Sequence, residues 1–131
     1  MIAHYPQAHY PLQDLTGLII RGFYTVYGEL VYGFLESVYE RSMVIVLTDM
    51  GLSVRHQVEV PVRFRSAEVG IYRADLVVED VVVVELKAGP TLHPAHSAQL
   101  LNLLRGSGLA VGLLLHFGPK PRIKRLIMSR H

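Results

Sequence analysis

The chain has 131 residues, which is the size of one domain, and a formal net charge of +2. Half of its residues are hydrophobic and 18% are charged, which excludes a disordered chain. The absence of cysteine excludes disulfides, thiolate zinc sites and cysteine nucleophiles. No apolar run reaches the length of a membrane span, and residues 1–13 lack the features of a secretory signal. We therefore expect a cytoplasmic protein. Such an apolar, short chain also favours self-association, most simply as a homodimer.

The predicted elements begin after residues 1–13, which repeat His-Tyr-Pro and are expected to form a flexible extension before one domain over 14–131. Asp14 is predicted to cap a helix over 15–32, and Gly33 separates this helix from a second one over 34–50. Strands are predicted over 54–65, 69–78 and 81–88, where β-branched residues cluster. A helix over 94–106, a buried strand over 109–117 and a short strand over 123–128 complete the chain. The first seven elements, in the order α-α-β-β-β-α-β, predict an α/β fold with a mixed sheet flanked by helices.

Three charged residues interrupt the apolar strands. Glu85 and Lys87 are two residues apart and share a strand face, and Asp75 interrupts the preceding strand. Such groups are costly to bury unless they are paired or bound to a metal. Two carboxylates on adjacent strands beside a lysine can hold Mg²⁺ or Mn²⁺ and a nucleophilic water. The alternative is an ordinary hairpin with an ion pair between Asp75 and Lys87.

The loop between these two strands decides which residues meet. A two-residue loop over 79–80 would place Asp75 opposite Val84 and turn Glu85 to the other face. A three-residue loop over 79–81, a five-residue loop or a bulge would place Asp75 opposite Glu85, and Arg73 opposite Lys87. Because the turn has no Asn-Gly or Asp-Gly, we predict the longer loop.

The C-terminal segment is basic and contains no acid. It includes Lys120, Arg122, Lys124 and Arg125. The residues are consistent with a phosphate-contacting strand and equally with a solvated chain end.

Several short motifs together carry a resemblance to a known family. They are Gly33-Phe-Leu-Glu36-Ser-Val-Tyr39-Glu40, Arg73-Ala-Asp75-Leu, Val84-Glu85-Leu-Lys87-Ala88, Ala98-Gln99-Leu-Leu-Asn102 and Val111-Gly-Leu-Leu-Leu-His-Phe117-Gly118. In this content and order the chain resembles the GxxExxY proteins of the PD-(D/E)XK nuclease-like superfamily. It departs from them at Val31-Tyr32, where a Gly-Pro is expected.

The resemblance implies a restriction-endonuclease-like core and a role for each matching residue. It implies that Asp75 and Glu85 bind the metal and that Glu36 completes the metal site. It implies that Lys87 orients or deprotonates the attacking water, and that Gln99 supports the site or touches the substrate. Tyr39 is expected to pack or form a hydrogen bond beside the site.

The leading hypothesis from the sequence is a Mg²⁺-dependent nuclease that hydrolyses phosphodiester bonds of DNA or RNA. Arg73 and the basic C-terminal segment would guide the nucleic-acid backbone. Two alternatives stay open. One is a catalytically silent module that binds nucleic acid or protein. The other is a structural homo-oligomer in which Asp75, Glu85 and Lys87 form a buried ionic cluster.

Overall fold

A computed structural model describes residues 12–128 of the chain. The elements are α1 (Leu12–Leu30), α2 (Glu36–Asp49), β1 (Val54–Phe64), β2 (Ala67–Val78), β3 (Val82–Ala88), α3 (Pro94–Ser107), β4 (Val111–Phe117) and β5 (Pro121–Ile127). The predicted element order is confirmed, including the short last strand. Helix α1 begins at Leu12, so the prediction that Asp14 caps it is wrong and Asp14 lies in its first turn. Most of the predicted flexible extension, residues 1–11, lies outside the described residues.

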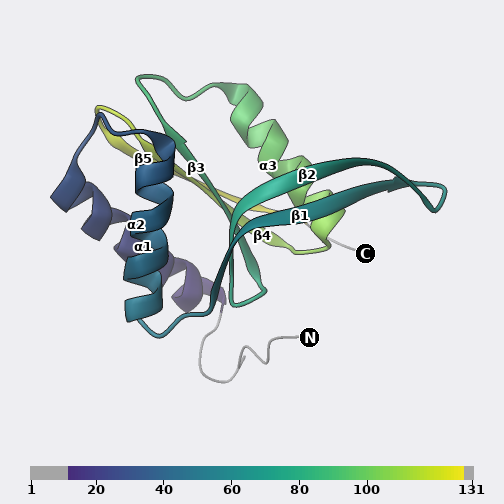
Figure 1. Ribbon diagram of the computed structural model, residues 1–131, viewed down its shortest axis with the longest axis horizontal. Helices are drawn as coiled ribbons and strands as arrows, with labels where there is room; N and C mark the ends of the chain where they lie inside the picture. The colour runs from purple at the N-terminus through teal and green to yellow at the C-terminus, as the bar shows by residue number, and fades with distance from the viewer. Residues whose placement is uncertain (1–11, 129–131) are drawn as a thin grey trace.

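The strands form one sheet in the order β1-β2-β3-β4-β5. Strands β3 and β4 are parallel and the other neighbours are antiparallel, so the sheet is mixed. Parallel strands need a crossover, and α3 provides it. Helices α1 and α2 cover one face of the sheet and α3 covers the other (Figure 1). This three-layer arrangement is the predicted restriction-endonuclease-like core.

The core is divided by the sheet into two apolar clusters. Leu76, Val84 and Leu86 pack toward α1 and α2, whereas Val77 and Val83 pack toward α3. Side chains alternate between faces along a strand, so Glu85 and Lys87 belong to the face covered by α3. The helix-facing positions are filled by aliphatic and aromatic side chains with little or no exposed surface.

The β1–β2 hairpin extends beyond the rest of the sheet as a two-stranded arm (Figure 1). The described pairing of β2 with β3 covers Leu76–Val78 and Val82–Val84, while its pairing with β1 continues to the tip of the hairpin. Pro61 lies in β1, an edge strand, where a missing N–H donor is tolerated.

No helix of the described residues is long and apolar enough to cross a membrane.

Candidate metal and nuclease site

The turn between α1 and α2 brings an acidic residue to the end of β3. Gly33 has φ +123°, a conformation that favours glycine, and α2 begins three residues later at Glu36. The Tyr39 hydroxyl fastens this turn because it donates to Val31 O and accepts from Phe34 N. Each residue of the motif therefore has a place in this turn. Gly33 takes the positive φ, Glu36 is the first residue of α2, and Tyr39 holds the turn through its hydroxyl group.

Tyr39 has a structural role, and Glu36 reaches the sheet. The Tyr39 ring is fully buried and stacks on Phe117 with ring centroids 4.1 Å apart. Glu36 Oε2 accepts a hydrogen bond of 3.3 Å from the backbone N–H of Ala88, which ends β3. The contacts of Tyr39 agree with the expectation that it packs and forms hydrogen bonds, whereas the role of Glu36 in completing a metal site stays a prediction.

The register between β2 and β3 is the longer one that we predicted. Val78 pairs with Val82 across a three-residue loop, and Leu76 pairs with Val84, which places Asp75 opposite Glu85. Beyond Leu76 and Val84, side-chain carboxylates take the place of backbone carbonyls as the hydrogen-bond acceptors between the two strands. Glu85 Oε2 accepts from Asp75 N, and Asp75 Oδ2 accepts from Leu86 N, both at 2.8 Å. The side chains thus occupy the point where the two strands separate.

Burial changes the protonation of this pair. Glu85 has only 3% of its surface exposed, and this burial, with the negative charge of Asp75, raises its pKa to about 8. The pKa of Asp75 is raised too, chiefly by burial, although the hydrogen bond from Leu86 opposes the shift. The charge of Glu36 raises both pKa values further. Glu36, at the start of α2, is therefore within electrostatic range of the two acids of the sheet.

Lys87 lies within electrostatic range of these acids without pairing with them. Its charge lowers the pKa values of Asp75 and Glu85, but among residues 12–128 no ion pair includes Lys87. The alternative of an ordinary ion pair between Asp75 and Lys87 is therefore not what the structure contains. Lys87 also faces His116 on β4 and lies near His96 of α3, whose pKa is lowered by burial first and by Lys87 second.

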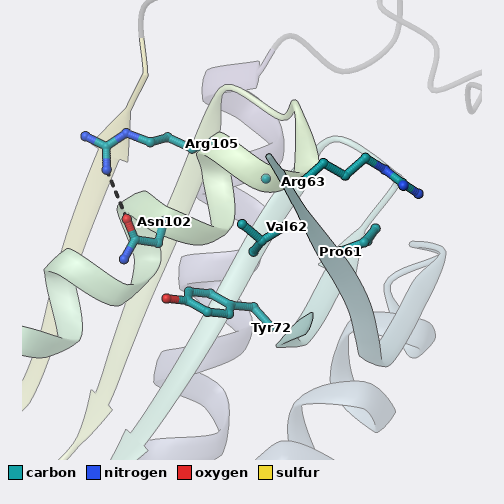
Figure 2. Close-up of a pocket in the computed structure, with 7 residues that line it drawn as sticks. Pro61, Val62, Arg63, Tyr72, Asn102 and Arg105 are labelled. Atoms are coloured by element: carbon teal, nitrogen blue, oxygen red, sulfur yellow. Dashed lines mark hydrogen bonds between the residues drawn. The ribbon is translucent and has the colours of Figure 1, made fainter. Parts of the chain in front are cut away.

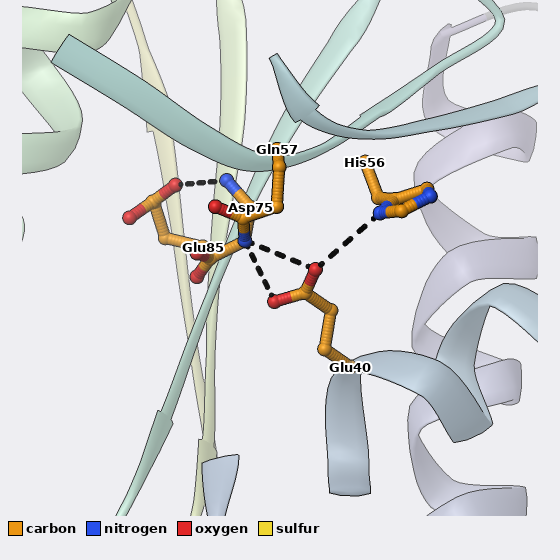
Figure 3. Close-up of polar contacts among 5 residues, drawn as sticks. All are labelled: Glu40, His56, Gln57, Asp75 and Glu85. Atoms are coloured by element: carbon orange, nitrogen blue, oxygen red, sulfur yellow. Dashed lines mark hydrogen bonds and ion pairs between the residues drawn. The ribbon is translucent and has the colours of Figure 1, made fainter. Parts of the chain in front are cut away.

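Gln57 is a member of the site that the sequence did not reveal. Its Nε2 donates to both carboxylate oxygens of Glu40 at 2.9 and 3.0 Å, and its side chain also forms a hydrogen bond that lowers the pKa of Asp75. Gln57 thus connects α2 to Asp75, with His56 on the far side of Glu40 (Figure 3). It has φ +53°, a strained conformation for a non-glycine residue within a strand.

The strands are irregular around Gln57. In β1 and β2 the described pairs on either side of Gln57 are His56 with Leu76 and Val58 with Ala74. Ala74 packs toward α3, whereas Leu76 packs toward the opposite helices, so the alternation of faces breaks between them. A polar residue in a predicted strand gives no sign of a positive φ, and no sequence pattern that we used could have found it.

The remaining predicted residues lie around this centre. Arg73 is 3.3 Å from Glu59 in an exposed ion pair on the β1–β2 arm, and the described β2–β3 pairing does not extend to Lys87. The predicted contact between Arg73 and Lys87 is therefore not formed. Gln99 lies on α3 beside a cavity that Arg73 also lines, and no hydrogen bond joins it to the acids.

The basic C-terminal residues lie on the exposed edge strand β5 and the turn before it. Arg122 faces His116, and Lys124 faces Leu114, on the face that carries Lys87 and Glu85. Arg125 faces Leu113 and so projects to the opposite face. Lys120 is exposed in the turn that precedes β5. Strand alternation therefore divides a basic cluster that is contiguous in the sequence between two faces of the sheet.

The donor set fits a hard divalent cation, although the ligands are not already gathered around one point. Carboxylate oxygens are the ligands that Mg²⁺ and Mn²⁺ prefer, and Asp75, Glu85 and Glu36 supply them. One oxygen of each carboxylate binds a backbone N–H. Within residues 12–128, no three His, Asp or Glu side chains form a ready metal-binding group.

A mixed sheet between helices, with acids where the β2–β3 hairpin separates and an E-x-K strand beside them, defines a nuclease-like class of fold. A family model described as the PD-(D/E)XK nuclease superfamily matches residues 13–126, and the chain belongs to this superfamily. No curated protein matches the chain.

The crystal structure of SSO0001 has a similar fold, with a TM-score of 0.56 and 17% sequence identity. The similarity covers 72% of this chain and 50% of that chain, so this chain spans about half the length of that protein. At this identity, the comparison supports the fold alone.

Proposed function

We propose that this chain is a divalent-metal-dependent nuclease of the GxxExxY type, acting on phosphodiester bonds of DNA or RNA. The observation that carries the proposal is that Asp75 and Glu85 lie side by side where β2 and β3 separate, with Glu36 in electrostatic range of both. Membership of the PD-(D/E)XK nuclease superfamily supports it. The negative charges of these carboxylates repel one another and raise the pKa values of Asp75 and Glu85. A bound cation would relieve this repulsion.

We assign each residue a role in this reaction. Asp75, Glu85 and Glu36 would hold Mg²⁺ or Mn²⁺, which when bound supplies a water of lowered pKa and a positive charge for the phosphate. Lys87 lies two residues after Glu85 on the same strand face and forms no ion pair among the described residues. Its ammonium group can therefore donate to the attacking water or to a phosphate oxygen.

The more distant basic residues would bind the nucleic-acid backbone. Strands in a sheet are about 4.8 Å apart, so Arg122, two strands away from Lys87 through His116, lies roughly 10 Å from it. Lys124 follows on the same face, beside Leu114, which separates it from Glu85 on β3. These two residues support the proposed phosphate contacts better than Arg125, which projects from the other face.

The test is cleavage of labelled single- and double-stranded DNA and RNA in the presence of Mg²⁺ or Mn²⁺. Wild type is compared with Glu85→Ala and with an EDTA control. Metal-dependent cleavage that Glu85→Ala removes is the expected result. Cleavage that survives Glu85→Ala would refute the residue assignments.

A catalytically silent binding module is the second candidate, and one observation favours it. The acids bind backbone N–H groups, and the described residues contain no ready metal-binding group. This candidate predicts nucleic-acid binding without cleavage in any metal, which the same gel and a parallel binding assay distinguish from a nuclease.

We further propose that the chain acts in the cytoplasm as a homodimer. The connection between α1 and α2 exposes several large apolar side chains, of which Leu35 is 75% and Val31 is 53% exposed. Phe34 and Tyr32 extend this surface. A contiguous apolar surface of this kind is typical of an interface between chains.

A further inference from the structure

A groove separates the β1–β2 arm from α3. One cavity of about 480 Å³ lies between Pro61, Val62, Tyr72 and the last turns of α3, and is shown in Figure 2. A second cavity of about 450 Å³ adjoins it toward the N-terminal half of α3. Tyr72 and Asn102 line both cavities, so the two form one continuous groove.

The groove leads toward the acidic site. Its inner part is lined by Arg73, two residues before Asp75, and by Gln99, three residues after His96. His96 in turn lies within electrostatic range of Lys87. The outer part reaches Arg105 and Arg63 toward the tip of the arm. A linear ligand lying in the groove would therefore pass from the arm to the residues that we assign to catalysis.

The chemistry of the groove suits a polyanion. The residues that line the two cavities include Arg63, Arg73 and Arg105, and no Asp or Glu. Arg105 donates to Asn102 Oδ1 at 3.0 Å from a neighbouring turn of α3, which holds its guanidinium beside Asn102 (Figure 2). Arg63 extends away from Tyr72 in the same view, and the guanidinium of Arg73 forms an ion pair with Glu59, so Arg105 is the best placed of the three to bind a phosphate.

Tyr72 provides an aromatic surface in the cavity that Arg105 also lines. It is 37% exposed, and its ring is directed toward α3 beside Asn102 (Figure 2). Aromatic rings flanked by cations are the elements with which proteins bind single-stranded nucleic acid, because any unpaired base can stack on them. In a duplex the bases are already stacked on one another, and a groove of ligand size admits a nucleotide chain more readily than a helix.

We propose that this groove binds a single strand of nucleic acid, with a base stacked on Tyr72 and a phosphate on Arg105. The groove would select single-stranded substrate for the proposed nuclease. This selection rests on the proposed function, whereas binding of the strand does not. An extended peptide added to the edge of β2 would depend on neither the Tyr72 ring nor the arginines.

The test is fluorescence anisotropy with a labelled oligothymidylate and a labelled duplex, using the full chain in EDTA so that no cleavage occurs. Wild type is expected to bind the single strand more tightly than the duplex. Tyr72→Ala is expected to weaken single-strand binding by about 5- to 100-fold, as loss of one stacked base does. Tyr72→Phe retains the ring and is expected to bind as wild type.

Two further variants separate stacking from charge. Arg105→Gln is expected to weaken binding and to reduce the dependence on salt by about 0.7 in the logarithmic slope, which corresponds to one phosphate of a single strand. Tyr24→Ala, at a 50% exposed tyrosine of α1, is the matched control and is expected to bind as wild type. Unchanged melting temperatures establish that each variant is folded.

The outcomes are decisive for the groove independently of the nuclease. Single-strand binding that Tyr72→Ala weakens supports the groove, even if no metal produces cleavage. Binding that is unaffected by Tyr72→Ala, a preference for duplex, or no binding of nucleic acid would overturn the proposal. If the wild type cleaves in the presence of metal and Tyr72→Ala binds the single strand as wild type does, the proposed nuclease activity stands and the proposed role of the groove is refuted.

Discussion

The protonation of Glu85 gives a direct way to test the geometry of the site through stability. In the absence of metal its pKa is raised from 4.5 to about 8, because the carboxyl is buried and faces Asp75. The folded state therefore holds a proton that the unfolded chain loses near pH 4.5. Stability from this residue is complete below pH 4.5 and falls as the pH rises toward 8.

The size of the effect follows from the interval between the two pKa values. The interval is about 3.5 pH units, and each unit corresponds to about 1.4 kcal/mol, so the loss approaches about 5 kcal/mol above pH 8. Glu85→Gln keeps the shape of the protonated acid and removes the titration. We expect this variant to unfold at higher denaturant concentration than wild type at pH 8, and to lose most of the wild-type pH dependence.

The assay is urea unfolding in EDTA at intervals between pH 5 and pH 8.5, followed by circular dichroism. Glu68→Gln, at an exposed position in β2, is the matched control and is expected to follow wild type. Equal pH dependence in wild type and Glu85→Gln would refute the reasoning, since it would mean that Glu85 ionises in the fold as it does in water.

Three further predictions concern Gln57, Gly112 and Leu35. Because Gln57 has φ +53°, Gln57→Gly is expected to be about 1 kcal/mol more stable than Gln57→Ala in chemical unfolding, although both lose the amide. A Cβ at Gly112 would lie 2.8 Å from Leu100 Cδ1, so Gly112→Ala is expected to cost about 1–3 kcal/mol in the same assay, whereas Gly70→Ala, with nothing within 4 Å, is expected to cost little. Leu35→Asp is expected to shift the light-scattering mass from dimer to monomer. Equal stability of the two Gln57 variants, a neutral Gly112→Ala, or an unchanged mass would contradict the corresponding inference.

Much of the fold was predictable because local patterns and global topology agree. The β-branched runs predicted the strands around Asp75 and Glu85, and the absence of a tight two-residue turn sequence favoured the three-residue loop that the structure contains. The apolar character of residues 109–117 predicted a buried strand, and β4 is buried at every position. The prediction that Asp14 caps the first helix was wrong, because the helix begins earlier, at Leu12.

The site was less predictable, because its long-range contacts have no local pattern. Arg73 was expected to face Lys87, but the β2–β3 pairing ends where the carboxylates of Asp75 and Glu85 occupy the ladder. Gln57 was missed because the bond from its amide to Glu40 joins an edge strand to α2 across 17 positions of the chain. A polar residue in an edge strand resembles an ordinary solvated one until the fold is known.

The central claim is that Asp75 and Glu85 hold a divalent cation, and its most direct test is a calorimetric titration of the full chain with Mn²⁺. Wild type is compared with the shape-preserving variants Asp75→Asn and Glu85→Gln. We expect that wild type binds Mn²⁺ and that either substitution removes or strongly weakens the binding, in a chain that circular dichroism shows to be folded. Binding of equal strength in all three proteins, or no binding by wild type, would contradict it.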